Sequence, residues 1–197
     1  MVRLSLSKTL MLVSIGLITI SSSSTIAYAG QGSQAVQTTQ VAPTADVKDV
    51  ASIDSIIAAL YDVISGPAGK KRDWDRMRSL FATGARLIPT VATSDGGFTA
   101  RMLTVEDYIT RSGDMLEKNG FFEREVARRS ESFGRIAQVF STYESRRTAE
   151  DKTPFARGIN SIQLMNDGKR WWIVTVFWQG EDAKNPLPPE YLKSKNE

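Results

Sequence analysis

The strongest constraint on the fold is a hydrophobic segment near the C-terminus that follows a turn. Residues 166–180 read Asn-Asp-Gly-Lys-Arg-Trp-Trp-Ile-Val-Thr-Val-Phe-Trp-Gln-Gly. Asp167-Gly168 is typical of a two-residue hairpin, because glycine adopts the positive φ that a type I′ turn requires. Nearly every side chain from Trp171 to Trp178 is apolar or aromatic, which predicts a strand with neither face turned to water. We expect helices of this chain to cover one face and a partner subunit to cover the other.

The first 29 residues have the pattern of a secretory signal peptide. Arg3 and Lys8 form a basic start, and residues 10–20 are an apolar run too short to span a bilayer. Ala27-Tyr28-Ala29 matches an A-x-A cleavage site. We therefore expect an exported protein, periplasmic or extracellular, that is not attached to a membrane after signal cleavage. The alternative is an uncleaved membrane anchor.

The composition excludes several kinds of chemistry for this chain. It contains no Cys and no His, which rules out disulfides, thiolate nucleophiles, Ser-His-Asp triads and His-ligated zinc. The formal net charge of +3 falls to +1 without residues 1–29, which carry two basic and no acidic side chains. Such a small charge gives no reason to expect a nucleic-acid partner. We expect no metal and no cofactor, and any catalysis would use Asp, Glu, Tyr or Lys.

The rest of the chain divides into a linker, one domain and a tail. Residues 30–48 are mainly Gln, Ser, Thr, Ala and Pro, which predicts a flexible linker. Residues 49–180 form the predicted domain, which is large enough for a hydrophobic core of its own. Residues 181–197 are a Pro-rich tail, which we interpret as an extended segment or, alternatively, as a docking motif for another protein module. Three residues would anchor the extended segment, namely Leu187, Tyr191 and Leu192.

Three helices are predicted before the main sheet. Apolar residues from Ile53 to Ile64 recur at three- and four-residue spacing, which predicts an amphipathic helix. Asp73 is a suitable N-cap for a short second helix that would end at Gly84. Thr104-Val105-Glu106-Asp107 resembles a capping box and starts a third helix that ends at Asn119-Gly120.

The chain after Gly120 predicts a sheet. Four long runs are rich in β-branched and aromatic residues and are separated by turn-like clusters, the first at Glu131-Ser132. Two shorter strands come earlier, at residues 85–88, ended by Pro89, and at residues 98–103. Short connections favour antiparallel neighbours, so the fold class is α+β with a curved, mostly antiparallel sheet. The four long runs are residues 121–129, 135–147, 155–165 and 170–179.

Two short motifs and the element order carry a resemblance to a known family. Leu80-Phe81-Ala82 leads into a strand, and Gly168-Lys169-Arg170-Trp171-Trp172-Ile173 opens the last one. Together with three helices and a final meander, residues 49–179 resemble the nuclear transport factor 2-like superfamily, here as an exported bacterial member. The resemblance implies a cone-shaped α+β barrel, in which the sheet wraps a long N-terminal helix with two further short helices. It also implies a pocket inside the cone and a homodimer through the outer sheet face.

The sequence departs from the enzymes of this superfamily, which include ketosteroid isomerases and polyketide cyclases. Steroid isomerases have a base aspartate a few residues after Leu-Phe-Ala, where this chain has Ile88-Pro89-Thr90, and the dehydratases need His. Three functions therefore stay open. The first is binding of a small apolar or aromatic molecule, the second a cofactor-free isomerase, cyclase or lyase that uses Asp or Glu with Tyr, and the third an accessory module without a ligand. Binding is our first hypothesis.

The candidate pocket residues are polar or aromatic side chains on the strands and one tyrosine on the first helix. A carboxylate near Tyr and Arg in an apolar cavity could act as an acid or base, because burial and charge move its pKa. The alternative places Glu123 and Glu125 on a solvated face, paired with arginines across the strands. In the dimer, Val174 or Val176 would face the partner, depending on whether a β-bulge shifts the alternation. The predicted pocket residues are Tyr61, Glu125, Tyr143, Arg157, Asn160 and Trp178.

Overall fold

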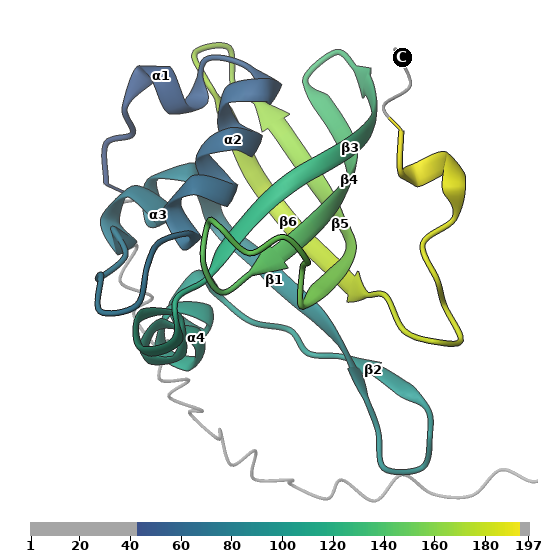
Figure 1. The fold of residues 1–197 in the computed structure, drawn as a ribbon. Coiled ribbons are helices and arrows are strands. Elements are labelled where there is room, and N and C mark those ends of the chain that lie inside the picture. The colour runs from purple at the N-terminus through teal and green to yellow at the C-terminus, as the bar shows by residue number, and fades with distance from the viewer. Residues whose placement is uncertain (1–42, 194–197) are drawn as a thin grey trace, which may run out of the picture. The chain divides into compact units, whose positions relative to one another are not determined.

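The computed structural model describes residues 43–193, which form an α+β domain with helices on one face of a curved sheet (Figure 1). The predicted signal peptide and most of the predicted linker lie outside the described residues. The helices are α1 (Val47–Val50), α2 (Ile53–Ile64), α3 (Trp74–Leu80), α4 (Val105–Asn119) and the 3-10 helix η1 (Pro189–Tyr191). The strands are β1 (Phe81–Ala92), β2 (Phe98–Ala100), β3 (Phe122–Phe133), β4 (Ile136–Arg146), β5 (Ala156–Asn166) and β6 (Trp171–Gly180).

The sheet has six strands in the order β2-β1-β6-β5-β4-β3. The pairing is antiparallel throughout except between β1 and β6, which run parallel. The predicted α+β class and the mostly antiparallel sheet are therefore confirmed. Strand β6, the hydrophobic segment that follows Asp167-Gly168, lies inside the sheet between β1 and β5.

The helix starts follow local capping chemistry. Ser52 and Ser55 form a capping box at the start of α2, and Thr104 and Asp107 form the predicted one at the start of α4. The N-terminal helix is not the longest, since α2 has 12 residues and α4 has 15. A short α1 precedes α2, and none of the described helices has the length and apolar character needed to cross a membrane.

Strand β1 differs from its prediction at both ends. The short helix α3 ends at Leu80, and Gly84 lies inside β1 with φ 80°, where the register to β6 is irregular. Gly84 therefore serves a bulge, because glycine tolerates positive φ there, and does not end a helix. The strand also continues past Pro89 to Ala92, since the Pro89 carbonyl still accepts a hydrogen bond from the Arg101 amide at 3.0 Å.

The hairpin between β3 and β4 turns later than predicted. Its tip is Gly134-Arg135, with φ 56° at Gly134, and Glu131 is still paired with Gln138. The predicted turn at Glu131-Ser132 is therefore wrong, because polar residues continue the exposed end of the hairpin instead of forming its turn. Gly134, which has a positive φ, marks this turn better than the polar residues do.

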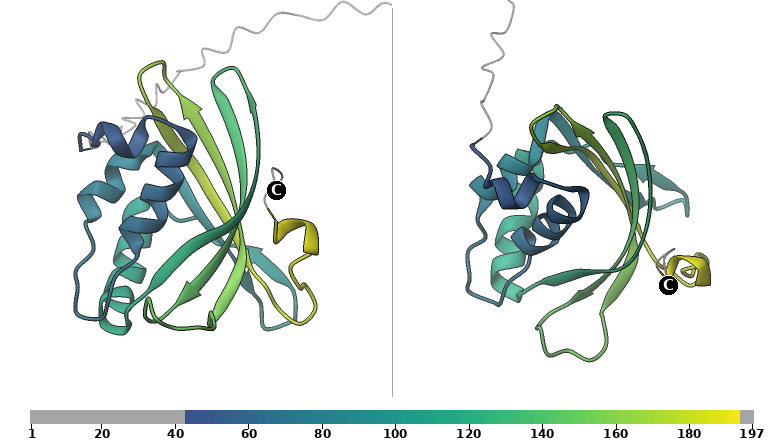
Figure 2. Two further views of the ribbon diagram at one scale, coloured as in Figure 1. Left: turned by 45° about the horizontal axis from the view of Figure 1, so that its top comes forward. Right: turned by 90° about the horizontal axis from the view of Figure 1, so that it is seen from above.

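The core lies between the helices and the concave face of the sheet, and the C-terminal tail lies on the opposite face (Figure 2). Alternate residues of β4, β5 and β6 point into this core, as the period of a strand requires. The largest fully buried side chains include Ile56, Ile57, Met77 and Leu80 from the helices and Val139, Ile162, Leu164 and Ile173 from the strands.

The buried Arg72 holds the ends of α2 and α4 together. Arg72 donates from Nε to the Ile64 carbonyl at 2.9 Å and from Nη2 to the Leu116 carbonyl at 3.0 Å. Ile64 ends α2 and Leu116 lies in the last turn of α4, so the guanidinium meets the negative ends of both helix dipoles. Its Nη2 also donates to the Gly66 carbonyl at 2.7 Å, and a Cβ on Gly66 would lie 2.8 Å from Arg72 Nη1.

Replacing Arg72 should unfold the domain more easily. We expect Arg72→Met to lower the free energy of unfolding by about 3 kcal/mol or more, because several buried carbonyl groups lose their donor. The matched control is Lys71→Met, at an exposed neighbouring position. Chemical denaturation of the two variants measures the difference, and equal stability would contradict the role of Arg72.

Candidate functional site

An inner cavity lies between α2, α4 and the concave face of the sheet. Its volume is about 120 Å³, and its wall is mostly apolar and aromatic. Beside it lies an open groove of about 640 Å³ between α2 and β3, and Tyr61 and Glu123 line both hollows. The inner cavity is lined by Leu60, Tyr61, Ile64, Met77, Leu87, Tyr108, Phe121, Glu123, Tyr143, Asn160, Val176 and Trp178.

Among residues 43–193, Glu123 is the only one that brings a carboxylate to the wall of the inner cavity. Protein atoms surround its carboxyl group closely, although the residue also borders the groove, and this burial raises its pKa to about 7. Ser145 Oγ donates to Glu123 Oε2 at 2.8 Å, and hydrogen bonding from Ser145 and Asn160 lowers the pKa in part. A carboxyl group that titrates near neutral pH can exchange protons or hold a charge at this position.

Three tyrosines surround Glu123 in the cavity. Tyr61 comes from α2, Tyr108 from α4 and Tyr143 from β4. Burial raises the pKa of each phenol, and the nearby charge of Glu123 raises it further. All three are therefore neutral at physiological pH. The ring of Tyr108 also meets Trp178 edge to face, with ring centroids 6.5 Å apart.

A glycine on β5 makes room for one of these tyrosines. Tyr143 pairs with Gly158 across the sheet, and a Cβ on Gly158 would lie 2.5 Å from the Tyr143 hydroxyl oxygen. No other residue could therefore occupy this position without displacing the Tyr143 ring. Gly158 on β5 thus leaves the space in which the Tyr143 side chain of β4 lies in the cavity wall.

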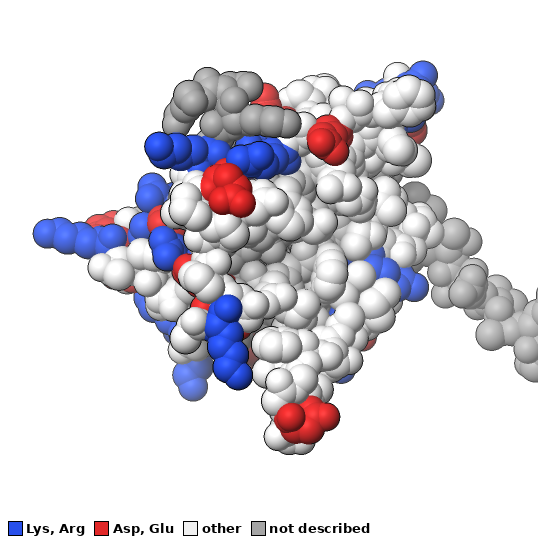
Figure 3. All heavy atoms as spheres, turned by 90° about the vertical axis from the view of Figure 1, so that its right-hand side faces the viewer, with Lys and Arg blue, Asp and Glu red and all other residues white. Residues whose placement is uncertain are grey.

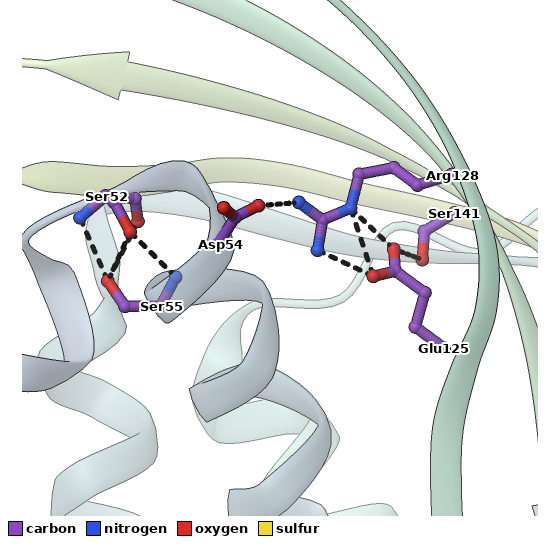
Figure 4. A network of polar contacts seen from close by, with 6 residues as sticks. All are labelled: Ser52, Asp54, Ser55, Glu125, Arg128 and Ser141. Atoms are coloured by element: carbon purple, nitrogen blue, oxygen red, sulfur yellow. Dashed lines mark hydrogen bonds and ion pairs between the residues drawn. The ribbon is translucent and has the colours of Figure 1, made fainter. Parts of the chain in front are cut away.

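A polar network connects the groove to the cavity (Figure 4). Arg128 binds the Glu125 carboxylate with Nη2 at 2.6 Å and also contacts Asp54 at the start of α2. Ser141 Oγ donates to Glu125 Oε1 at 2.5 Å and lies 2.7 Å from the Tyr61 hydroxyl. Because the Ser141 proton is directed to Glu125, Tyr61 must be the donor to Ser141.

A β-bulge places Glu125 and Arg128 on the same face of β3. The register to β4 shifts between Glu125 and Ala127, which leaves Val126 as the extra residue. Residues three apart in a regular strand would point to opposite faces. The bulge thus decides a question that the irregular sequence pattern left open, and Glu125 faces the groove.

The six predicted pocket residues do not all come together. Four of them, Tyr61, Tyr143, Asn160 and Trp178, lie in the cavity wall. Glu125 lies in the groove instead. Whether any of these side chains contacts a ligand remains a prediction.

Arg157 lies on the outer face, so its place in the predicted pocket is wrong. Gly158 and Asn160 occupy the inward positions of β5, and the alternation of the strand turns Arg157 outward. Its Nε donates to Glu181 Oε2 at 2.8 Å, at the start of the C-terminal tail.

Sequence reasoning missed Glu123 and Tyr108 as cavity residues. Glu123 appears in the predictions only in the alternative of paired charges on a solvated face, although it precedes the candidate Glu125 by two positions and so shares its face. Tyr108 lies on the inward side of an amphipathic helix and could have been found from its spacing to Ile109 and Leu116. Among the residues that the structure describes, no group of three Asp or Glu side chains is arranged to hold a metal ion.

The outer face of the sheet carries a separate hollow of about 500 Å³, between β5, β6 and the tail. Uncharged residues fill the middle of this face in Figure 3, and charged side chains lie toward its edges. The tail covers part of the face, since the Tyr191 ring lies 5.3 Å from that of Phe140 and its carbonyl accepts from Thr142 Oγ1 at 2.6 Å. Leu187 also lines the hollow, whereas Leu192 is exposed.

Val174 and Val176 differ in direction because of a bulge in β6. The register between β5 and β6 shifts after Gln163, so that Val174 is the extra residue between Ile173 and Thr175. Val176 is buried and lines the inner cavity, whereas Val174 is exposed on the outer face. Only Val174 can therefore face a partner subunit.

The raised pKa of Glu123 should make stability depend on pH. Its carboxyl keeps a proton up to about pH 7 in the folded domain, against an ordinary value of 4.5 in the unfolded chain. Raising the pH between these values therefore favours unfolding, by up to about 3 kcal/mol. Glu123→Gln removes this titration and keeps the shape of the neutral acid.

We expect the stability of the wild type, measured relative to Glu123→Gln, to fall from pH 5 to pH 8. Denaturant unfolding of both proteins at the two pH values measures this difference. The matched control is Glu131→Gln, an exposed position on the same strand. A constant difference between wild type and Glu123→Gln would show that Glu123 titrates normally.

Comparisons with known proteins give a fold and no more. No protein-family model matches the sequence, and a search of curated proteins gives no match. A protein of unknown function with a cystatin-like fold from Nostoc punctiforme PCC 73102 superposes with a TM-score of 0.51 at 13% identity, over 66% of this chain and 90% of that chain. The crystal structure of LinA superposes with a TM-score of 0.50 at 10% identity, over 71% of this chain and 92% of that chain.

A further solved structure has a name that matches the predicted superfamily. It is an NTF-2 like protein of unknown function from Silicibacter pomeroyi DSS-3, with a TM-score of 0.45 and 13% identity, over 66% of this chain and 94% of that chain. The domain shares the cystatin-like fold of the Nostoc punctiforme protein, at a TM-score of 0.51. The names of the structures found agree with the superfamily that the resemblance implied. Identities this low relate folds and leave function to the site itself.

Proposed function

We propose that this domain, with its nuclear transport factor 2-like fold, binds a small and mainly apolar or aromatic molecule in the inner cavity. The observation that carries the proposal is a cavity with aromatic walls and a single carboxyl group, Glu123, at its border with the groove. Ligand sites commonly combine an apolar wall with a few polar groups that fix orientation. Trp178, Tyr108 and Tyr143 would contact the apolar part, and Glu123 would bind the polar part.

The size of the hollows limits the ligand. The cavity of about 120 Å³ is smaller than most ligand pockets, which begin at about 300 Å³. It is close to a cavity of about 150 Å³ that holds benzene. We therefore expect one ring or one compact group inside the cavity, with the rest of the molecule in the adjoining groove.

Filling the cavity should abolish binding without unfolding the domain. Val176→Phe adds a ring to the cavity wall and should cost about 1–3 kcal/mol of stability. The matched control is Val174→Phe on the outer face of the same strand. We expect compounds from a broad library to raise the melting temperature of the wild type and of Val174→Phe, but not of Val176→Phe. No stabilising compound, or equal stabilisation of both variants, would contradict binding in this cavity.

A second candidate is a cofactor-free isomerase, cyclase or lyase. The observation that favours it is the pKa of about 7 at Glu123, since a general acid or base works best near its own pKa. Glu123 would move the proton, and the neutral Tyr108 and Tyr143 would donate hydrogen bonds to the developing charge. This candidate requires a substrate whose turnover is lost in Glu123→Gln while the variant stays folded.

We also propose that two copies of the domain associate through the part of the outer face that the tail leaves open. Val174, Phe177, Ile136 and Met165 are exposed large apolar residues on this side of the sheet. Such residues support an interface, because a soluble monomer rarely exposes them side by side.

A charge on the outer face should separate the subunits. We expect Val174→Glu to be monomeric at micromolar concentration, where the wild type is dimeric, because an unpaired carboxylate would be buried in the interface. The control is Thr110→Glu, at an exposed position of α4 on the helical side. Light scattering measures the oligomeric state of the three proteins, and a monomeric wild type would disprove the dimer.

Export is part of the same proposal. The basic start, the apolar run and the A-x-A site of residues 1–29 support removal of this segment during secretion. The mass of the protein recovered from its native compartment would then correspond to a chain beginning at Gly30. A chain that keeps residues 1–29 would contradict cleavage.

A further inference from the structure

We propose that the molecule bound in the inner cavity is an organic cation, whose ammonium group pairs with Glu123. The inference rests on the proposed binding function and names the chemical class of the ligand. It is carried by the distribution of charges around Glu123, by the aromatic walls and by the directions of the hydrogen bonds.

Glu123 lacks the cation that comparable carboxylates have. Glu125 pairs with Arg128 at 2.6 Å, Glu144 with Arg146 at 2.8 Å, and the buried Asp49 with Arg76 at 2.7 Å. Within residues 43–193, no Lys or Arg forms an ion pair with Glu123, whose hydrogen-bond donors are the neutral Ser145 and Asn160. A carboxylate that is removed from water without a counter-ion is costly, and a bound cation would offset this cost.

The walls around Glu123 suit a positive charge. Tyr61, Tyr108 and Tyr143 come from three different elements, and Phe121 and Trp178 complete the aromatic lining. The faces of such rings carry partial negative charge and attract ammonium groups, most strongly where water is excluded. An anionic ligand would meet the opposite conditions, because it would lie beside Glu123.

The hydrogen bonds of Tyr61 also favour a ligand that donates. Asn160 Nδ2 donates to the Tyr61 hydroxyl at 3.1 Å, and the Tyr61 proton is directed to Ser141. Because Ser141 in turn donates to Glu125, Tyr61 has no proton left for a carbonyl or carboxylate in the cavity. Tyr61 and Glu123 therefore offer acceptors to a ligand, whereas the neutral hydroxyls of Tyr108 and Tyr143 can still donate.

Titratable groups lie near Glu123 on both its cavity side and its groove side. Tyr61, Tyr108 and Tyr143 face it in the cavity, and the raised pKa of each keeps it neutral over the pH range of interest. The elements α3, β1, β5 and β6 contribute only uncharged residues to the cavity wall. The charged groups on the groove side are Asp62, Arg124, Glu125, Arg128, Arg146, Asp151 and Lys152.

Pairs of molecules with the same shape and different charge test the inference. Choline is compared with 3,3-dimethylbutan-1-ol, and benzylammonium with benzyl alcohol, by isothermal titration calorimetry at pH 8. We expect each cation to bind at least ten-fold more tightly than its neutral counterpart. Choline has no titrating group on its ammonium, so its affinity should fall about ten-fold from pH 8 to pH 6, as Glu123 takes up a proton with a pKa of about 7.

Two variants assign the effect to Glu123. Glu123→Gln should lose both the preference for the cation and its pH dependence, whereas Glu131→Gln on the same strand should keep them. Circular dichroism verifies that both variants are folded. A preference for cations that persists in Glu123→Gln, or that does not change with pH, would overturn the inference.

The outcomes separate the inference from the proposed function. If the neutral molecules bind as tightly as the cations, the cavity binds ligands but the inference is wrong. If none of the four molecules binds at millimolar concentration, both the inference and the proposed binding of small molecules in this cavity are refuted.

Discussion

The arrangement of the site depends on Arg72, a buried guanidinium whose hydrogen-bond acceptors are backbone carbonyl groups. Arg72 is stabilised by carbonyl groups at the ends of α2 and α4, where both helix dipoles are negative. These two helices carry Tyr61 and Tyr108, so the guanidinium fixes the distance between two walls of the cavity. Glu123 presents the reverse case, because its surroundings neutralise it only in part. The fold thus gives the buried Arg72 several acceptors and leaves Glu123 without an ion-pair partner among the described residues.

Two single-residue insertions decide which side chains reach the site. The bulge at Val126 brings Glu125 and Arg128 to one face of β3, where Glu125 accepts a hydrogen bond from the Ser141 hydroxyl that contacts Tyr61. The bulge at Val174 turns Val176 toward the cavity. A strand without these insertions would reverse its faces beyond the insertion point, since the side-chain period is two. The site is therefore built by irregularities of the sheet as much as by its regular strands.

The sequence predicts those features that have local causes. The capping box at Thr104 and the apolar period of residues 53–64 act within a few residues, and both appear where expected. The long strands were found for the same reason. The faces of Glu123 and Arg157 depend on register with neighbouring strands, and no local pattern reports that register. Gly84 was misassigned similarly, because a glycine that ends a helix and one that serves a bulge look alike in sequence.

The parallel pairing of β1 with β6 has a consequence for how the chain assembles. Strands β3 to β6 can pair one after another through hairpins. Ile88 of β1, however, pairs with Phe177 of β6, and nearly half of the chain separates the two residues. Closing so distant a contact is slow, because a long loop is ordered before any pairing energy is gained. A nascent chain that stops before Trp171 would leave β1 and β5 with open edges. Such edges pair readily with other chains, so the last strand to be synthesised is also the one that protects the domain from aggregation.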